Sequence, residues 1–260
     1  MTTNQDLLVD AEELRTAVRS KYSDVATNPD AEFHFQTGRP LAERLGYPSD
    51  ILAALPDETI ASFAGVDNPF AAGPIPEGSR VADLGSGGGF DCLVASRIVG
   101  PEGRVVGVDM TPEMLERATR MAGLVDATNV EYREGILEDV PIDAGWADVV
   151  ISNGVINLVA DKAVVFAEAA RILRPGGCLQ FADIAVGAEV PDAARCDIDL
   201  WTDCIAGALS VDDWCDLITA AGFSDVAVGM PTDTFGGTNG EDRARQFQVN
   251  AHTFRARKPA

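Results

Sequence analysis

Residues 83–91 read DLGSGGGFD, and this stretch decides how the rest of the chain is expected to fold. The run RVADL at 80–84 is predicted to be a buried strand, and FDCLVASRIV at 90–99 is predicted to be a helix. Glycines at 85, 87 and 89 let the backbone turn sharply off the strand and leave no side chain between the main chain and a ligand. The stretch therefore predicts a strand–loop–helix unit with a ligand at its loop.

The same alternation continues after this unit. Strands are predicted at 104–110, 129–134, 147–152 and 178–184, and helices at 111–123 and 161–173. Strands that alternate with helices indicate βαβ units and a mainly parallel sheet, so the fold class is α/β.

Both ends of the chain depart from this pattern. After residue 191, two helices are predicted at 192–208 and 211–221, and two extended runs at 223–230 and 245–257 are predicted to pair as an antiparallel hairpin at a sheet edge. Residues 1–79 hold too little apolar material for a core of their own, so they are interpreted as an N-terminal helical cap or lid. The predicted division is a cap at 1–79 and a ligand-binding domain at 80–260.

An acidic residue follows the second strand. Asp109 stands 24 residues after Gly85, where a carboxylate can accept two hydrogen bonds from a ribose diol. Position 90 is Phe90, so the third glycine comes one residue earlier than in dinucleotide folds, which favours S-adenosylmethionine, a cofactor without a pyrophosphate, over NAD. Asp83 and Asp91 flank the loop, where they either meet the methionyl part of the cofactor or cap the turn.

Charge narrows the possible partners. The chain has 260 residues, with 20 Lys and Arg against 41 Asp and Glu, for a net charge of −21. Such a surface repels phosphate backbones and anionic membranes, so neither nucleic acid nor membrane is expected as a partner. The first residues carry acidic groups where a secretory signal carries positive charge, and no run approaches the roughly 20 apolar residues that span a bilayer. We expect a soluble, cytoplasmic protein, and the sequence leaves its oligomeric state open.

The cysteines and histidines do not predict a metal site. The five cysteines, at 92, 178, 196, 204 and 215, are scattered without a C-x-x-C pair, and there are two histidines. This pattern fits neither a disulfide framework nor a zinc site, so no metal is expected. Free thiols in a reducing compartment remain, most of which serve as small buried hydrophobic residues.

Taken together, these motifs resemble those of the class I S-adenosylmethionine-dependent methyltransferases, and among them those of the arsenite methyltransferase family. The resemblance covers about residues 45–223 and rests on GYPSDILAALPDETIASFAGVDNPF, DLGSGGGFD, GRVVGVDMTPEML, EGILEDVP, ADVVISNGVINL, RILRPGG and LWTDCIAGAL. It implies a Rossmann-like, seven-stranded, mostly parallel sheet with an antiparallel last hairpin and an N-terminal helical cap.

The resemblance also implies a set of cofactor contacts. Three lie at the glycine loop and would hold the methionyl end, Asp109 would take the ribose, and the others would pack on the adenine or close over the methionyl side. The predicted set is Asp83, Gly85, Gly87, Asp109, Met110, Ile136, Leu137 and Asn153.

The match to the arsenic site is incomplete. In arsenite methyltransferases, thiolates hold trivalent arsenic, and Cys92 and Cys204 match two of those cysteines. The family's cysteine pair ahead of the GY motif is missing, and Gly154 stands where another cysteine is expected. Losing a thiolate lowers both the affinity and the geometric control of an arsenic site. Gly154 then either vacates space for a larger acceptor or relaxes a turn.

The segment around residues 30–45 is predicted to be a lid over the acceptor. It offers His34, either as a general base or as a hydrogen-bonded residue between two aromatic side chains, and Gln36. The predicted catalytic residues are His34, Cys92 and Cys204. The predicted acceptor contacts are Arg39, Gly154, Asn157 and Trp201.

These observations predict an S-adenosylmethionine-dependent methyltransferase that acts on a small-molecule acceptor and resembles arsenite methyltransferases but has diverged in substrate. Two alternatives remain. One is an arsenite methyltransferase that uses Cys92 and Cys204, and the other is a protein that binds the cofactor without methylating.

Overall fold

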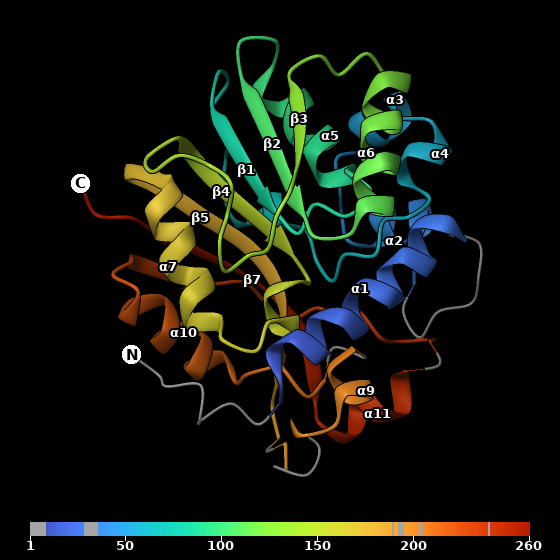
Figure 1. Ribbon diagram of the computed structural model, residues 1–260, viewed down its shortest axis with the longest axis vertical. Coiled ribbons are helices and arrows are strands. Elements are labelled where there is room, and N and C mark those ends of the chain that lie inside the picture. The colour runs from blue at the N-terminus through green and yellow to red at the C-terminus, as the bar shows by residue number, and fades with distance from the viewer. Residues whose placement is uncertain (1–8, 29–35, 189, 192–194, 203–204, 239) are drawn as a thin grey trace.

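The computed structural model describes residues 9–28, 36–188, 190–191, 195–202, 205–238 and 240–260. A seven-stranded sheet in the order β3-β2-β1-β4-β5-β7-β6 forms its centre, with helices on both faces (Figure 1). The strands are β1 (Arg80–Leu84), β2 (Arg104–Asp109), β3 (Val130–Glu134), β4 (Ala147–Asn153), β5 (Leu173–Val186), β6 (Ser224–Val228) and β7 (Val249–Arg257).

Strand pairing confirms the predicted fold class. The first five strands of the sheet order pair in parallel, whereas β7 lies antiparallel between β5 and β6. From β1 the chain builds the sheet outward through β2 and β3, and it then returns to place β4 and β5 on the other side of β1. This reversal between β1 and β4 is a topological switch point, and ligands of open α/β sheets bind outside the carboxyl ends of the strands there.

Helices pack their apolar side chains on both faces of the sheet. Side chains of α7 and α10, among them Phe166 and Trp214, pack on one face of the sheet, and α5 packs Cys92, Ala95 and Val99 on the other. The helices that follow residue 80 are α5 (Phe90–Val99), α6 (Pro112–Leu124), α7 (Lys162–Ile172), α9 (Ile198–Thr202), α10 (Val211–Ala220) and α11 (Glu241–Gln246), with a 3-10 turn, η2 (Ile156–Leu158).

Local sequence signals explain where several helices start. Pro112 opens α6, where its missing N–H costs nothing. The Asp161 side chain accepts a hydrogen bond from the Ala163 N–H and caps α7. These starts place the loops at the carboxyl ends of β2 and β4 on the same edge of the sheet as the glycine loop.

The elements before residue 80 pack onto the sheet's helices. Leu41, Leu52 and Ile60 share a buried cluster with Phe90 of α5 and Met121 of α6. In Figure 1 α1 runs across the lower edge of the sheet, and it contacts both α6 and α9. The elements are α1 (Ala11–Thr27), α2 (Gly38–Arg44), α3 (Ser49–Ala54), α4 (Asp57–Ile60) and η1 (Pro69–Ala72).

Three predicted elements differ in extent. The strand predicted at 178–184 is the longer β5, which begins at Leu173 and includes the RPGG stretch. Of the helix predicted at 192–208, the described residues contain the short α9. Further along the chain, Leu209 bridges to Ala185, and a Cβ at Gly207 would lie 2.0 Å from the Asn157 carbonyl oxygen, so residues 207–209 pack as a loop against the sheet. The extended run predicted from 245 begins as the end of α11, in which Arg245 donates to Glu241 one turn earlier. Strand β7 starts at 249.

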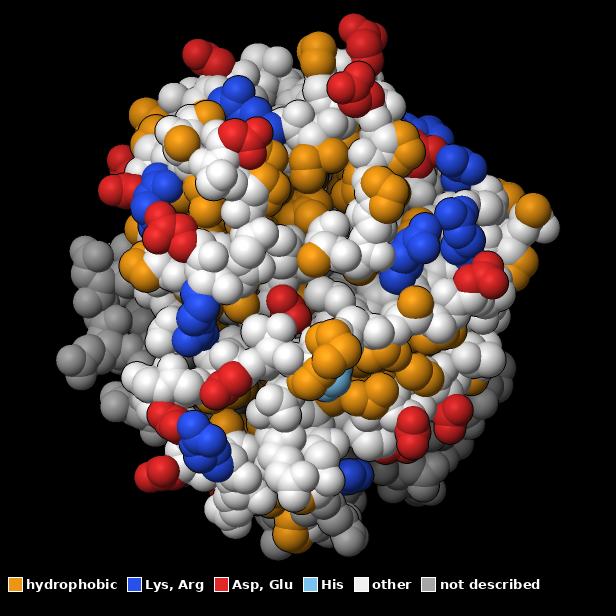
Figure 2. Space-filling view, turned by 180° about the vertical axis from the view of Figure 1, so that it is seen from behind, with side chains coloured by type: hydrophobic (Ala, Val, Ile, Leu, Met, Phe, Trp, Pro, Cys, Tyr) orange, Lys and Arg blue, Asp and Glu red, His pale blue; other side chains and the backbone are white. Residues whose placement is uncertain are grey.

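The surface follows the composition. On the face shown in Figure 2, Lys and Arg side chains are dispersed among acidic ones rather than gathered in one stripe. No helix in the described part of the chain is long and apolar enough to cross a membrane.

Candidate active site

A cleft of about 1050 Å³, part of it open to solvent, lies at the carboxyl ends of β1, β2 and β4. It is the crevice that the switch point predicts. The cofactor contacts implied by the sequence come together here, since each of them lines the cleft: Asp83, Gly85, Gly87, Asp109, Met110, Ile136, Leu137 and Asn153. Side chains that follow different parallel strands meet at this edge because the strand ends are aligned.

The glycine loop has a steric reason for its composition. Gly85 has a φ of +75°, and a Cβ at this position would lie 2.5 Å from Cγ1 of Val155. Gly89 has a φ of +87° and precedes the first residue of α5. Glycine is required at both positions because L side chains rarely adopt this conformation. The backbone of the loop therefore forms one side of the cleft directly.

Asp109 holds the loop and faces the cleft. One carboxylate oxygen accepts the Gly87 N–H at 2.9 Å and the other accepts the Thr111 N–H at 2.9 Å. Burial raises the pKa of Asp109, and the backbone hydrogen bonds counteract this. Each carboxylate oxygen has a further lone pair. The residue can therefore accept both hydroxyls of a ribose while keeping the loop in place, which fits an adenosyl ligand.

A polar network closes the opposite end of the cleft. The Tyr47 hydroxyl donates to Asp91 at 2.7 Å, and the Asn153 amide donates to the other Asp91 oxygen at 3.0 Å and to the Asp67 carbonyl at 2.8 Å. The Asn153 carbonyl oxygen accepts the Val66 N–H at 2.9 Å. Residues from the segment before residue 80 thus fix two cleft-lining side chains, Asp91 of α5 and Asn153 of β4.

Burial governs the protonation of these groups. It raises the pKa of Asp91 to about 6, although the hydrogen bonds from Tyr47 and Asn153 oppose the rise. Burial and the nearby Asp91 raise the pKa of Asp83 well above its ordinary value. Above about pH 6 the Asp91 carboxylate is mostly ionised, which suits the positive charge of a methionyl ammonium or sulfonium.

Sequence reasoning overlooked two contributors to the site. Tyr47 belongs to the GY motif. Its role in the network depends on contacts with Asp91 and Asn153, two residues that are distant from it in the chain. Leu14, Val18 and Tyr22 of α1 line the cleft. Their spacing of four residues marks one helical face and is the signal that could have identified them.

Helix α1 covers the cleft on the side of the β3–β4 connection. Arg15 donates to Glu138 at 3.2 Å, and both residues line the cleft. Lys21 donates to the Thr202 carbonyl at 3.0 Å, which ties α1 to α9. Among the described residues before residue 80, α1 and residues 62–65 line the cleft, whereas residues 36–45 of the predicted lid do not.

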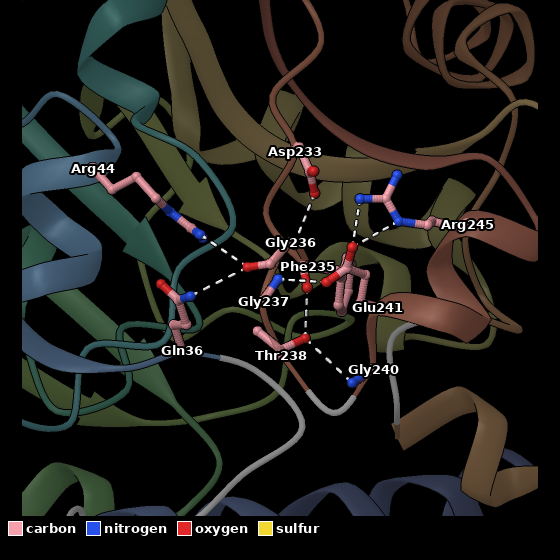
Figure 3. A network of polar contacts seen from close by, with 10 residues as sticks. All are labelled: Gln36, Arg44, Asp233, Phe235, Gly236, Gly237, Thr238, Gly240, Glu241 and Arg245. Carbon is pink, nitrogen blue, oxygen red and sulfur yellow. Dashed lines mark hydrogen bonds and ion pairs between the residues drawn. The ribbon is translucent and has the colours of Figure 1, made fainter.

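The described part of the predicted lid is tied to the body of the protein. Figure 3 shows Gln36 and Arg44 pointing at the carbonyl of Gly236, with donor–acceptor distances of 3.3 and 3.4 Å. Arg39 pairs with Asp57 and donates to the carbonyls of Leu52 and Leu55. These contacts hold α2 against α3 and α4 and leave the Arg39 side chain away from the cleft lining.

Two predicted catalytic residues, His34 and Cys204, lie outside the described residues. The third, Cys92, is fully buried and does not line the cleft. Its thiol lies 3.2 Å from the Asp83 carboxylate, to which it donates, and burial together with Asp83 raises its pKa. A neutral, enclosed thiol is a poor ligand for a metalloid.

Gly154 does not leave open space. Its φ is +71°, and a Cβ there would lie 2.9 Å from Cγ1 of Val66. Its N–H donates to the Ala182 carbonyl at 2.8 Å. The expectation that a vacated volume admits the acceptor is wrong for this position, because Val66 occupies that volume and the backbone conformation itself favours glycine.

The remaining predicted acceptor contacts lie behind the cleft wall. Asn157 is fully buried, and its N–H and side-chain amide donate to Asp183 at 3.1 and 2.8 Å. Trp201 is 7% exposed and donates its indole N–H to the Arg195 carbonyl. Neither residue lines the cleft. Among the described residues there is no group of His, Cys, Asp and Glu that could hold a metal ion.

The chain is similar to known methyltransferases along most of its length. A methyltransferase-domain family model matches residues 75–222. The arsenite methyltransferase of Halobacterium salinarum is 38% identical over 96% of this chain and 68% of its own length. The mouse arsenite methyltransferase is 40% identical over 56% of this chain and 42% of its own length. The chain thus spans about two thirds of the first relative and less than half of the second.

Solved structures agree with these relatives. An arsenic(III) S-adenosylmethionine methyltransferase from Chlamydomonas reinhardtii shares 31% identity, with a TM-score of 0.63 over 86% of this chain and 75% of that chain. The predicted resemblance and cofactor are confirmed. The chain belongs to the methyltransferase-domain family, as a class I S-adenosylmethionine-dependent enzyme related to the arsenite methyltransferases.

Proposed function

We propose that this enzyme transfers a methyl group to a small organic acceptor rather than to arsenite. The observation that carries the proposal is the position of the thiols. Trivalent arsenic is held by soft thiolate ligands. None of the described cysteines lines the cleft, because Cys92 and Cys178 are buried in the sheet layers, Cys196 is exposed away from the cleft lining and Cys215 lies on α10.

The cleft itself supports methyl transfer. S-adenosylmethionine supplies an electrophilic methyl group, and the chain's task is to align the acceptor with it and exclude water. Asp109 would hold the ribose, and Asp91 with Asn153 would hold the methionyl end. Leu14 and Val18 of α1 add apolar cover to the cleft.

The proposed location of the enzyme is the cytoplasm. All four described cysteines are free, which is typical of proteins in a reducing compartment and supports this location.

Arsenite is the second candidate because the relatives act on it. The Halobacterium salinarum relative is an arsenite methyltransferase that matches 96% of this chain. Arsenite methylation by this chain would have to rely on Cys204 with thiols supplied from solution, since Cys92 is enclosed and donates to Asp83.

The two candidates differ in what the protein methylates. We would incubate it with S-adenosylmethionine carrying a labelled methyl group and either arsenite with glutathione or a panel of phenols, amines, thiols and carboxylates. We expect label in one organic class and little in methylated arsenic. The test variant is Cys204→Ser. Its control is Cys178→Ser, because Cys178 belongs to β5 and does not line the cleft.

Arsenite methylation at a rate equal to or above that of every organic acceptor, abolished by Cys204→Ser and unaffected by Cys178→Ser, would contradict the proposal. The reverse result, with organic methylation insensitive to both variants, would support it.

A further inference from the structure

Lys162 occupies an unusual place for a lysine. It is the first residue of α7, where the helix dipole disfavours a positive charge, and it is only 6% exposed. Lysine is almost never buried to this extent without a partner. Its local sequence context alone does not explain why an ammonium is placed there.

The surroundings of Lys162 explain the placement. Its Nζ donates to the Val159 carbonyl at 2.8 Å and lies 4.7 Å from the centre of the Trp201 ring. Such a cation over an indole face is stabilised by the ring quadrupole. The ammonium therefore joins the loop after β4 to the segment that carries Trp201, two parts of the chain about 40 residues apart in sequence.

Asp183 of β5 completes the arrangement from behind. It is fully buried, and its carboxylate accepts the Asn157 N–H, the Asn157 amide and the Ile184 N–H. The charged groups that act on Lys162 are Asp183 on β5, Asp161 at the start of its own helix and Arg195 ahead of α9. The two carboxylates favour the ammonium, whereas Arg195 and burial oppose it.

The loop held in this way is a wall of the cleft. Val155, Leu158, Val159 and Ala160 line the cleft, and Val155 also packs against the glycine loop at Gly85. Asp183 fixes the middle of the loop through Asn157, and Lys162 fixes its end through Val159. Lys162 itself does not line the cleft, so any influence it has on the reaction acts through this wall.

We infer that Lys162 is a positioning residue for methyl transfer: its positive charge clamps the 155–160 wall between β5 and the Trp201 indole, and turnover depends on that clamp. The inference rests on the proposed methyl-transfer function. A displaced wall would misalign acceptor and cofactor without removing any group that touches them.

The titration of Lys162 makes the clamp sensitive to pH. Burial lowers the pKa of Lys162 to about 7. Below that value the ammonium is charged and attracted to the Trp201 ring, and above it the amine is neutral and the attraction is lost. Turnover should therefore fall as pH rises through about 7. Arginine stays charged at all accessible pH values, so Lys162→Arg should remove this alkaline fall.

The test compares Lys162→Met, Lys162→Arg and Lys258→Met. Lys258 is a matched control, because its Nζ also donates to backbone carbonyls, those of Ala170 and Leu173, near the other end of α7. With the acceptor found above, we expect Lys162→Met to lower kcat about tenfold to a hundredfold while KM for S-adenosylmethionine changes little. Lys162→Arg should retain more activity and lose the alkaline fall, and Lys258→Met should behave as the wild type.

An acceptor-independent measurement separates this inference from the proposed function. Tryptophan fluorescence should titrate with a midpoint near pH 7 in the wild type, and both Lys162→Met and Trp201→Phe should abolish that step. A separate step near pH 6 belongs to Asp183, whose pKa burial raises to about 6, and is not counted. If the fluorescence titrates but no acceptor is methylated, the proposed function fails and the clamp geometry stands. Wild-type kcat in Lys162→Met, or an unchanged alkaline fall in Lys162→Arg, would overturn the inference.

Discussion

Replacing Gly154 by cysteine tests the steric account of this position. The family resemblance suggests that the change restores an arsenic-binding thiol, but the structure predicts mainly a loss of stability. A non-glycine residue at a φ of +71° costs about 1–2 kcal/mol. The new Cβ would also lie 2.9 Å from Cγ1 of Val66, a β-branched side chain with little rotamer freedom.

The two contributions can be separated. Overpacking of this kind costs roughly 1–3 kcal/mol, so Gly154→Cys should lower the free energy of unfolding by about 2–5 kcal/mol in total. Gly78 has a similar φ of +76° and nothing within 4 Å of an added Cβ. Gly78→Cys should therefore lose only about 1–2 kcal/mol, which is the backbone contribution alone.

A double-mutant cycle with Val66→Ala isolates the clash. Removing the two methyl groups of Val66 should relieve most of the overpacking, giving a favourable coupling of about 1–3 kcal/mol. Urea unfolding of the four proteins at equal m values measures this coupling. Additivity within about 0.5 kcal/mol would refute the reasoning, because it would show that the added side chain does not meet Val66. Tighter arsenite binding by Gly154→Cys without loss of stability would contradict it as well.

Three further outcomes are expected. Asp109→Ala should weaken S-adenosylmethionine binding by about 1.5–3 kcal/mol, or roughly tenfold to 150-fold in Kd by calorimetry, because it removes charge-assisted acceptors; an unchanged Kd would exclude the ribose assignment. Tyr47→Phe should lower the free energy of unfolding by about 1–3 kcal/mol and weaken cofactor binding, because Asp91 and Asn153 lose a buried partner. If the variant is as stable as the wild type and calorimetry gives the same cofactor affinity, the network does not have this role. The pKa of Asp91, about 6, lies above its ordinary value of 3.8, so the folded state retains a proton that the unfolded state releases between these values. Stability should therefore fall as pH rises from about 4 to about 6, and Asp91→Asn should flatten that slope in urea unfolding, whereas an identical slope would show that Asp91 does not titrate in this range.

The cofactor cleft could be predicted from local sequence. Gly85, Asp109 and Asn153 each lie at or just after the end of a strand, and the carboxyl ends of parallel strands meet at one edge of the sheet. Recognising the strands and their following loops was therefore enough to bring these residues together. The glycine loop needed no tertiary information either, because its backbone conformation is a property of the residues themselves.

Other features depend on contacts between distant segments. Whether Cys92 faces the cleft or Asp83 is decided by the rotation of α5 against the sheet, and the space beside Gly154 is decided by Val66 from a segment almost 90 residues earlier. The cover that α1 provides and the clamp around Lys162 arise in the same way. The sequence by itself determined the sheet, the cofactor loop and the family, since these follow from local patterns. Only the tertiary structure decided which thiols are enclosed and what holds the cleft wall, because packing between remote elements leaves no local pattern.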